Sequence, residues 1–172
     1  SRKSCSPSII LLMNNSPQEY LAFANKLADA AGIISMEYFR TSLSIDSKSD
    51  ESPVTIADQN TELKIRSMIE KEYPNHGILG EEFESVNPDA EFIWVIDPID
   101  GTRSYIAGHK DFGNLISLTQ NKKPIIGIIN CPAHDERWVG VINQKSTVNQ
   151  KIVKTSNVTA IEDAYIFTSG LY

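Results

Sequence analysis

The sequence predicts an α+β fold in which two N-terminal helices pack on a mostly antiparallel sheet. Apolar residues recur with helical spacing in two stretches before residue 73. After residue 76 the apolar segments are short and are separated by turn-forming residues. Helices that precede a run of strands, instead of alternating with them, favour α+β over a parallel α/β sheet.

The first expected helix begins after Ser16 and runs to about Phe39. Ser16 suits the N-cap, Pro17 suits the first helical position, and Glu19 completes a capping box. Apolar residues follow at intervals of three and four, which predicts that they pack in the core. These residues are Leu21, Ala24, Leu27, Ala28, Ala31, Ile34 and Tyr38.

The segment Thr41–Pro53 is polar and rich in serine, so we expect a loop there. A second helix is expected over Ile56–Glu72, and the turn-forming residues 74–77 end it. Its inward side chains are expected to be Leu63, Ile65, Met68 and Ile69.

Strands are expected in the remainder of the chain, two of them joined as a hairpin around residues 121–123. Their expected ranges are Gly77–Gly80, Glu91–Asp97, Phe112–Gln120, Pro124–Asn130, Arg137–Ile142, Lys151–Val153 and Ala164–Thr168. Trp94 and Trp138 are expected to be core aromatics. His76, His109 and His134 share no metal-binding spacing and are expected in loops or at the surface.

The composition limits the classes of protein to which this chain could belong. The chain has 172 residues, of which 41% are hydrophobic, enough for a core. The net charge is −6 and there is no dense basic run, so nucleic acid is a poor partner. No apolar stretch approaches the roughly 20 residues of a membrane helix. Cys5 and Cys131 show no zinc or CxxC spacing, which favours reduced thiols and a cytoplasmic protein.

Two acids stand where an apolar strand is expected to end. Asp97 and Asp100 follow the run Phe92–Ile96, with Pro98 restricting the backbone and Gly101 permitting a sharp bend. Buried charge is costly unless it is paired or binds metal. With the upstream pair Glu81-Glu82, these acids offer hard oxygen ligands, and the Ile99 carbonyl can add another. The pattern therefore predicts a Mg²⁺ site.

The residues after this turn indicate an anion site. If Gly101 and Thr102 begin a helix, their N–H groups can hold a phosphate. The Thr102 hydroxyl could orient or deprotonate a metal-bound water, provided that a carboxylate takes the proton. Asp58 is a candidate for that carboxylate. It is equally well explained as a first-turn acid that serves the helix dipole.

At this point the sequence resembles the inositol monophosphatase family of Mg²⁺-dependent, lithium-sensitive phosphomonoesterases. The resemblance rests on Gly80-Glu81-Glu82 and on Trp94-Val95-Ile96-Asp97-Pro98-Ile99-Asp100-Gly101-Thr102. It covers the chain from about Ser16 to its end. It implies the first lobe of an αβαβα sandwich, with residues 1–15 as a non-core extension and residues 16–172 as the lobe.

The resemblance also implies roles for single residues. Metal ligands would be Glu81, Asp97, the Ile99 carbonyl and Asp100, which together would hold two or three Mg²⁺ ions. Gly101 and Thr102 would contact the phosphate. Thr102 and Asp58 would activate the attacking water, which Glu81 would help to hold. Lys48 would lie in a loop that approaches the site.

Within the family, the chain looks most like the histidinol-phosphate phosphatases. The residues that carry this resemblance include Arg103, Ser104-Tyr105-Ile106, Gly108, Phe112-Gly113, Leu115-Ile116 and Glu136-Arg137-Trp138. Arg103 could grip a phosphate or a substrate carboxylate, or it could brace its loop. Histidinol phosphate is the first expected substrate. Inositol phosphate or another small sugar phosphate is the alternative.

The chain departs from the family pattern in one respect. The resemblance implies a second lobe in which a Trp-Asp-x-Ala-Ala-Gly motif adds an aspartate ligand, and this sequence has no such motif. A function from another class is therefore an inactive metal-binding fragment or interaction module. The resemblance also suggests a homodimer.

Overall fold

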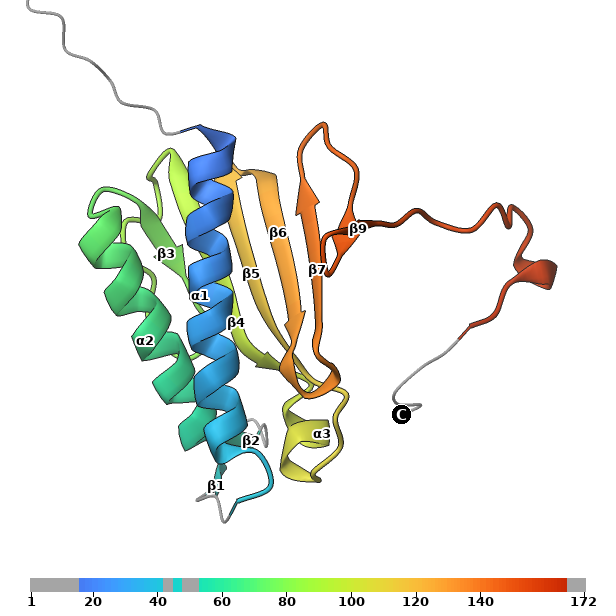
Figure 1. Cartoon of the computed structure of the whole chain (residues 1–172). Coiled ribbons are helices and arrows are strands. Elements are labelled where there is room, and N and C mark those ends of the chain that lie inside the picture. The colour runs from blue at the N-terminus through green and yellow to red at the C-terminus, as the bar shows by residue number, and fades with distance from the viewer. Residues whose placement is uncertain (1–15, 42–44, 48–52, 167–172) are drawn as a thin grey trace, which may run out of the picture.

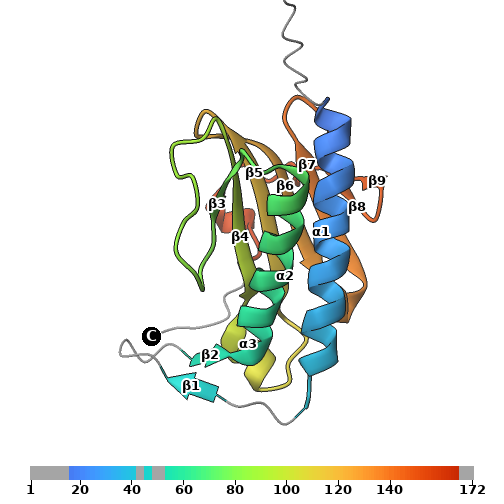
Figure 2. The ribbon, with the colours of Figure 1, turned by 90° about the vertical axis from the view of Figure 1, so that its left-hand side faces the viewer.

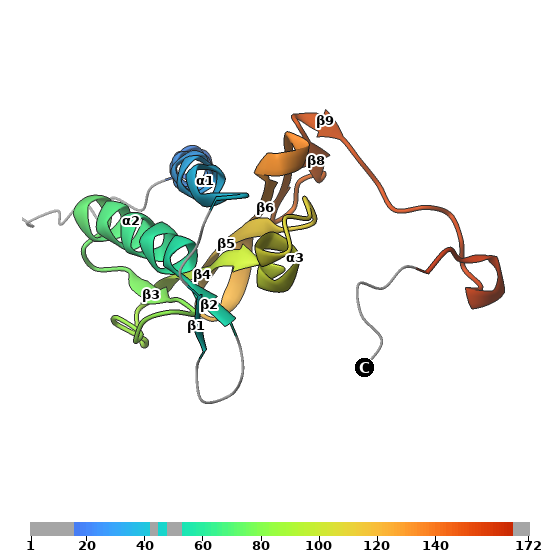
Figure 3. The same cartoon turned by 90° about the horizontal axis from the view of Figure 1, so that it is seen from below.

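The computed structural model describes residues 16–41, 45–47 and 53–166. Helices α1 and α2 lie side by side on one face of a seven-stranded sheet (Figures 1 and 3). The elements are α1 (Pro17–Tyr38), β1 (Ile45–Ser47), β2 (Pro53–Thr55), α2 (Ile56–Glu72), β3 (Gly77–Leu79), β4 (Phe92–Asp100), α3 (Thr102–Ile106), β5 (Gly113–Gln120), β6 (Lys123–Cys131), η1 (Pro132–His134), β7 (Glu136–Val141), β8 (Thr147–Val148), β9 (Lys151–Ile152) and η2 (Ile161–Asp163).

The expected α+β class is confirmed. In the large sheet the strand order is β3-β4-β5-β6-β7-β8-β9. β3 pairs parallel to β4, and every other pair in this order is antiparallel. The core lies between this sheet and the two helices, and its fully buried members include Leu27, Ile65, Trp94 and Leu118.

The start of α1 has the predicted capping box. The Ser16 backbone N–H donates to Glu19 Oε2 at 2.6 Å, and the Glu19 N–H donates to Ser16 Oγ at 3.3 Å. The helix ends with Phe39 as its C-cap, as expected. Two orphan N–H groups of the first turn are thereby satisfied by local side chains.

Helix α2 has the predicted bounds, with one error in its inward face. Ile65 and Ile69 are fully buried and Met68 is partly buried, but Leu63 is 50% exposed. Residues two positions apart on a helix point in nearly opposite directions, so Leu63 cannot share the face of Ile65.

The segment Thr41–Pro53 was expected to be a loop, and this is wrong in part. β1 and β2 form a short antiparallel ladder in which Ile45 opposes Thr55 and Ser47 opposes Pro53. The ladder is made by backbone groups, and the polar side chains give no alternating pattern to signal it. Lys48 and residues 1–15 lie outside the described residues.

The strand predictions hold for the large sheet, apart from the end of β4 and the C-terminal end of the sheet. The two-residue strand β8 was not expected. A strand over Ala164–Thr168 was expected, but residues 164–166 carry none, and the rest of that range lies outside the described residues. The segment after β9 runs away from the sheet (Figures 1 and 3).

Strand β4 does not end at Asp97 as predicted but continues to Asp100. Asp97 pairs with Leu115 and Asp100 with Gly113, so β4 holds one residue more than β5 between these pairs. This is a β-bulge. The strand can pass through Pro98 because its missing N–H falls within the bulge, where proline is tolerated.

The sheet face opposite the helices is not covered by any described helix (Figure 2). The strand register places Asp97, Leu115, Ile129 and Trp138 in one row across this face. Ile129 is 49% and Trp138 is 40% exposed, so the expectation of a core Trp138 is wrong. A hollow of about 520 Å³ lies on this face and reaches Asp97.

No helix in the described residues is long and apolar enough to cross a membrane.

Candidate functional site

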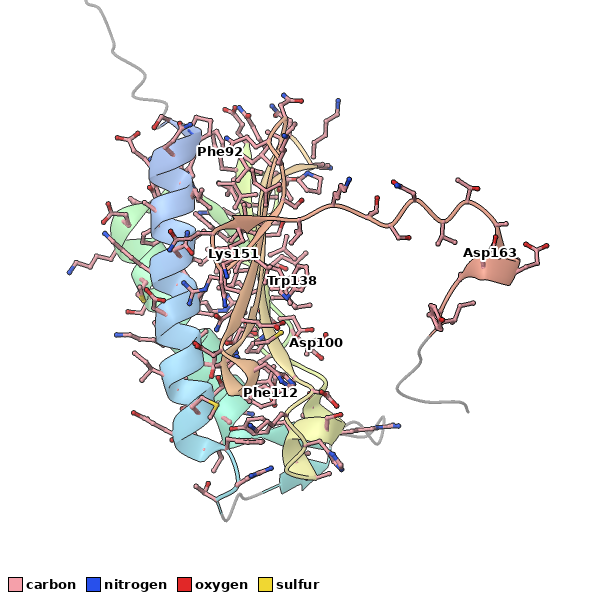
Figure 4. The ribbon with its side chains drawn as sticks, turned by 45° about the vertical axis from the view of Figure 1, so that its right-hand side comes forward. Phe92, Asp100, Phe112, Trp138, Lys151 and Asp163 are labelled. Carbon is pink, nitrogen blue, oxygen red and sulfur yellow. The ribbon has the colours of Figure 1, made fainter. Side chains whose placement is uncertain are left out.

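The candidate site lies at the end of β4, where the strand meets α3. Figure 4 shows Asp100 at this end of the sheet near Phe112, whereas Phe92 lies at the opposite end of the same strand. The N-terminus of α2 and the loop after β3 supply the other predicted residues, Asp58 and Glu81.

The bulge explains how two acids three residues apart can share one site. Side chains alternate along a regular strand, so residues i and i+3 point to opposite faces. The extra residue in the bulge reverses this alternation, which leaves Pro98 and Ile99 both buried in succession. Asp97 and Asp100 then share a side, and the Asp100 charge acts on the Asp97 carboxyl.

Asp97 is the most perturbed acid in the site. Its Oδ1 is buried and has no hydrogen-bond partner among the residues that the structure describes. The pKa of Asp97 is raised to about 7, chiefly by burial and then by the charges of Glu81, Asp100 and Asp58. The side chain also hydrogen-bonds that of Glu81. Four acids from three parts of the chain are therefore within electrostatic reach of one another.

Asp58 lies in the first turn of α2, as predicted, and is 3% exposed. Its charge raises the pKa of the Asp97 carboxyl and of the buried Tyr105 hydroxyl. This places Asp58 beside both the acid cluster and α3. The two explanations of Asp58, a water-activating partner and a first-turn acid, are both compatible with its position.

Gly101 and Thr102 begin a helix, as the anion-site hypothesis requires. Gly101 is the N-cap of α3 with φ +84°, and a Cβ there would come within 2.8 Å of the Asp111 carbonyl oxygen. Thr102 Oγ1 donates to the Ile99 carbonyl at 2.9 Å. The N-cap glycine has no side chain with which to cap the N–H groups of this helix. Arg103 is exposed in its first turn.

The segment that carries Glu81 is held by α2. Glu81 is exposed, and the next backbone N–H, that of Glu82, donates to Glu62 Oε2 at 2.8 Å. Glu62 also accepts from Arg66 Nε at 2.7 Å. Sequence reasoning missed this pair. The sequence did carry a signal for it. Glu62 lies three positions before Ile65 and seven before Ile69, so it falls on the same inward face of α2.

A second buried contact missed by sequence reasoning lies at the bulge. Asn114 Nδ2 donates to the Pro98 carbonyl at 2.7 Å, and Asn114 Oδ1 accepts from Asn130 Nδ2 at 2.9 Å. Both asparagines are buried. An asparagine inside an otherwise apolar strand was the available signal, since a buried amide needs partners.

The donor set suits a hard cation, although the site is not a closed cage. Among the described residues, no three His, Cys, Asp or Glu side chains are arranged to enclose a metal ion. Carboxylates and a carbonyl are nevertheless the ligands that Mg²⁺ prefers. The partnerless buried oxygen of Asp97 is a donor site that a cation would satisfy.

Among the described residues, no histidine is grouped with these acids in a way that could hold a metal ion. His76 lies in the turn between α2 and β3, as expected, and is half-buried there between the rings of Tyr73 and Phe92. Its Nδ1 accepts from Trp94 Nε1 at 3.1 Å. His134 Nε2 lies 3.1 Å from Asp111 Oδ1. Cys131 is a free thiol, and burial raises its pKa.

Comparisons with known proteins place this chain in a family. A sequence profile of the inositol monophosphatase family matches residues 16–171. The bifunctional phosphatase IMPL2, chloroplastic, of Arabidopsis thaliana is 39% identical over 169 residues, which are 92% of this chain and 49% of that protein. A histidinol-phosphatase of Chlorobaculum parvum is 39% identical over 139 residues, 80% of this chain and 54% of that protein.

A solved structure supports the same fold. An inositol monophosphatase from Zymomonas mobilis matches with a TM-score of 0.73 and 43% identity, over 84% of this chain and 56% of that one. The chain therefore spans about half the length of the relatives it matches.

Proposed function

The chain belongs to the inositol monophosphatase family, and we propose that its acid cluster serves a Mg²⁺-dependent hydrolysis of a small phosphate monoester. The observation that carries this proposal is the buried Asp97 oxygen without a hydrogen-bond partner, beside Glu81 and Asp100. Water or a protein donor would ordinarily satisfy such an atom, and leaving it bare is costly. A bound cation would satisfy this buried oxygen.

The Mg²⁺ ions, two or three by resemblance, would be held by Glu81, Asp97, Asp100 and the Ile99 carbonyl. Bound there, Mg²⁺ would polarise the phosphoryl oxygens and lower the pKa of the attacking water. The Ile99 carbonyl already accepts from Thr102 and has a second lone pair available for a ligand.

The chain's own residues have distinct tasks in this proposal. The N–H groups of Gly101 and Thr102 bind the phosphate at the start of α3. Thr102 Oγ1 orients the attacking water, and Asp58 accepts the proton through it. Glu81 holds the water from the opposite loop. Arg103, exposed in the same turn, contacts the substrate at its outer end.

We propose histidinol phosphate as the preferred substrate, with inositol phosphate or a related sugar phosphate as the alternative. The relatives named for each activity support both choices, and the 39% identity to a histidinol-phosphatase favours the first. Relative kcat/KM values for the two substrates decide between them. A preference for inositol phosphate would contradict the first choice.

We also propose that residues 16–172 form one lobe of a larger enzyme, which by resemblance would be a cytoplasmic homodimer, with residues 1–15 outside its core. Because the chain spans about half of its relatives, an inactive metal-binding or interaction module is the competing function. The partly exposed row of apolar side chains beside Asp97 favours the module if the chain works alone.

A phosphatase assay separates the enzyme from the module. The chain is assayed with and without Mg²⁺, beside a version fused to the second half of a histidinol-phosphatase relative. We expect Mg²⁺-dependent turnover at least in the fusion. Asp100→Asn should lower it by a factor of 10² or more, because it removes a charged ligand.

Asp89→Asn is the matched control. Asp89 is exposed in the loop that precedes β4, at the opposite end of that strand from the bulge. It should leave turnover unchanged. Absence of turnover in both versions would contradict the phosphatase and support the module.

A further inference from the structure

We propose that the buried ion pair between Glu62 and Arg66 is a positioning device that holds Glu81 opposite Asp97. This inference rests on the proposed function, because it treats Glu81 as a metal ligand. Nothing in the family resemblance drawn from the sequence singles out Glu62 or Arg66. The argument comes from the contacts that the pair makes with the segment on either side of Glu81.

The pair is buried and its charges are matched. The side chain of Glu62 is fully buried and that of Arg66 is 8% exposed, with Arg66 Nε 2.7 Å from Glu62 Oε1. The two residues are four positions apart on α2, so they face the same way. Burial of a lone carboxylate would be very costly, which ties each residue to its partner.

Each member of the pair also binds the backbone just after Glu81. The Glu82 N–H donates to Glu62 Oε2 at 2.8 Å. Arg66 Nη2 donates to the Phe83 carbonyl at 2.9 Å, and its guanidinium lies 5.8 Å from the centre of the Phe83 ring. One N–H and one C=O of consecutive residues are thereby fixed to a single helix.

The backbone just before Glu81 is in contact with the same carboxylate. A Cβ at Gly80 would overlap Glu62 Oε1 and would also contact its carboxyl carbon. A larger residue at position 80 would therefore displace the Glu62 carboxylate from its place beside Arg66. With residues 80, 82 and 83 all against the pair, the main chain of Glu81 has little freedom to move.

Stability alone does not account for this arrangement. A buried ion pair is often no more stabilising than apolar side chains of the same volume. What apolar side chains could not supply is directional hydrogen bonding. The carboxylate holds a backbone donor while the guanidinium holds a backbone acceptor. Glu81 is itself exposed, and its carboxylate must reach the Asp97 side chain from a loop.

The test compares metal binding with local motion. The variants are Glu62→Gln, Arg66→Lys and the double variant Glu62→Leu/Arg66→Met, each as the full chain. Mg²⁺ affinity is measured by calorimetry, and amide hydrogen exchange is measured at residues 80–84. Glu70→Gln is the control, because Glu70 is exposed on the same helix. Unfolding in urea reports global stability.

We expect the double variant to remain folded, to bind Mg²⁺ about 10–100-fold more weakly, and to exchange residues 82 and 83 at least 10-fold faster. Arg66→Lys should show a smaller loss, since lysine keeps the charge but cannot serve both Glu62 and Phe83. Glu70→Gln should match the unchanged chain in both measurements.

Two outcomes overturn the inference. Unchanged Mg²⁺ affinity with faster exchange would make the pair merely structural, and unchanged exchange would mean that it does not hold the segment. Failure of the unchanged chain to bind Mg²⁺, or binding that Glu81→Gln leaves intact, would instead contradict the proposed function and the positioning role with it. Weaker binding with faster exchange in the pair variants alone supports the inference.

Discussion

Asp97 combines a cost to stability with a proposed benefit to function, and one substitution can separate the two. At about pH 8 its carboxylate is charged in a site that burial and neighbouring acids make unfavourable. Asp97→Asn removes the charge and lets an amide donate to Glu81. We expect the metal-free chain to gain about 1–3 kcal/mol, less than the full pKa shift implies because water reaches part of the side chain.

The same variant should lose Mg²⁺ binding, because an amide is a poor substitute for a charged ligand. Urea unfolding with and without Mg²⁺ measures both effects. Asp89→Asn, at an exposed position, should change neither. A destabilised Asp97→Asn chain would show that the carboxylate is satisfied in the folded state by something other than a cation.

His76 makes stability depend on pH near neutrality. Burial lowers its pKa, and the charge of Glu91 opposes this only in part. The unfolded state therefore takes up a proton first, so stability is complete above the ordinary histidine pKa of about 6.5 and falls as the pH is lowered below it. Protonation would also remove the Nδ1 lone pair that accepts from Trp94.

Unfolding free energies between about pH 7.5 and about pH 5.5 test this prediction. His76→Phe keeps a ring in the stack, so we expect a lower stability, from the unpaired Trp94 N–H, with a flatter pH dependence. His109→Gln is the control, since His109 is exposed in the loop after α3. An equal slope in the His76→Phe and unchanged chains would contradict the assignment.

At the scale of elements, the bulge in β4 depends on a side chain from β5. Asn114 replaces a regular ladder bond by donating to the Pro98 carbonyl. Asn114→Ala leaves that carbonyl and the Asn130 amide without this buried partner, so we expect a loss of about 1–3 kcal/mol. Amide exchange at residues 99–102 should become faster, because the bulge is no longer held.

Thr119→Val is the matched control for this prediction. Thr119 lies at the other end of β5, where its hydroxyl donates to the Ile93 carbonyl at 3.2 Å. Its loss should leave exchange at residues 99–102 unaltered. Equal effects of the two substitutions on these amides would mean that Asn114 contributes only to general stability.

The elements that the sequence predicts well are those with local signals. The capping box at Ser16 and the turn residues after Glu72 are read directly from neighbouring residues, and both helices have the expected bounds. The β1–β2 ladder and the continuation of β4 through Pro98 depend on pairing with distant backbone, which side-chain patterns do not encode. Family resemblance named the acids, but the contacts of Glu62 and Asn114 required the fold.

At the scale of the whole molecule, the two faces of the large sheet differ in how far they are covered. The helix-covered face is packed, whereas the opposite face exposes an apolar row that includes Ile129 and Trp138. Contiguous apolar surface of this kind favours association. We expect Ile129→Thr/Trp138→Ser to reduce binding of a hydrophobic dye severalfold and to reduce concentration-dependent sedimentation.

Ile33→Thr is the control, because Ile33 is 62% exposed on α1, away from this row. It should leave dye binding nearly unchanged. Equal dye binding by the double variant and the unchanged chain would show that the row is not the exposed apolar surface.

The extra residue in β4 has a consequence for how this gene can change in length. Losing one residue between Asp97 and Asp100 would remove the bulge and leave the two acids two positions apart on a regular strand, where they still point to one side. Losing two would make the acids adjacent, and regular alternation would then send the second acid toward the side now filled by Ile99, Tyr105 and Phe112. Loss of one residue here should therefore be tolerated better than loss of two, an order that a small library of deletions can reveal.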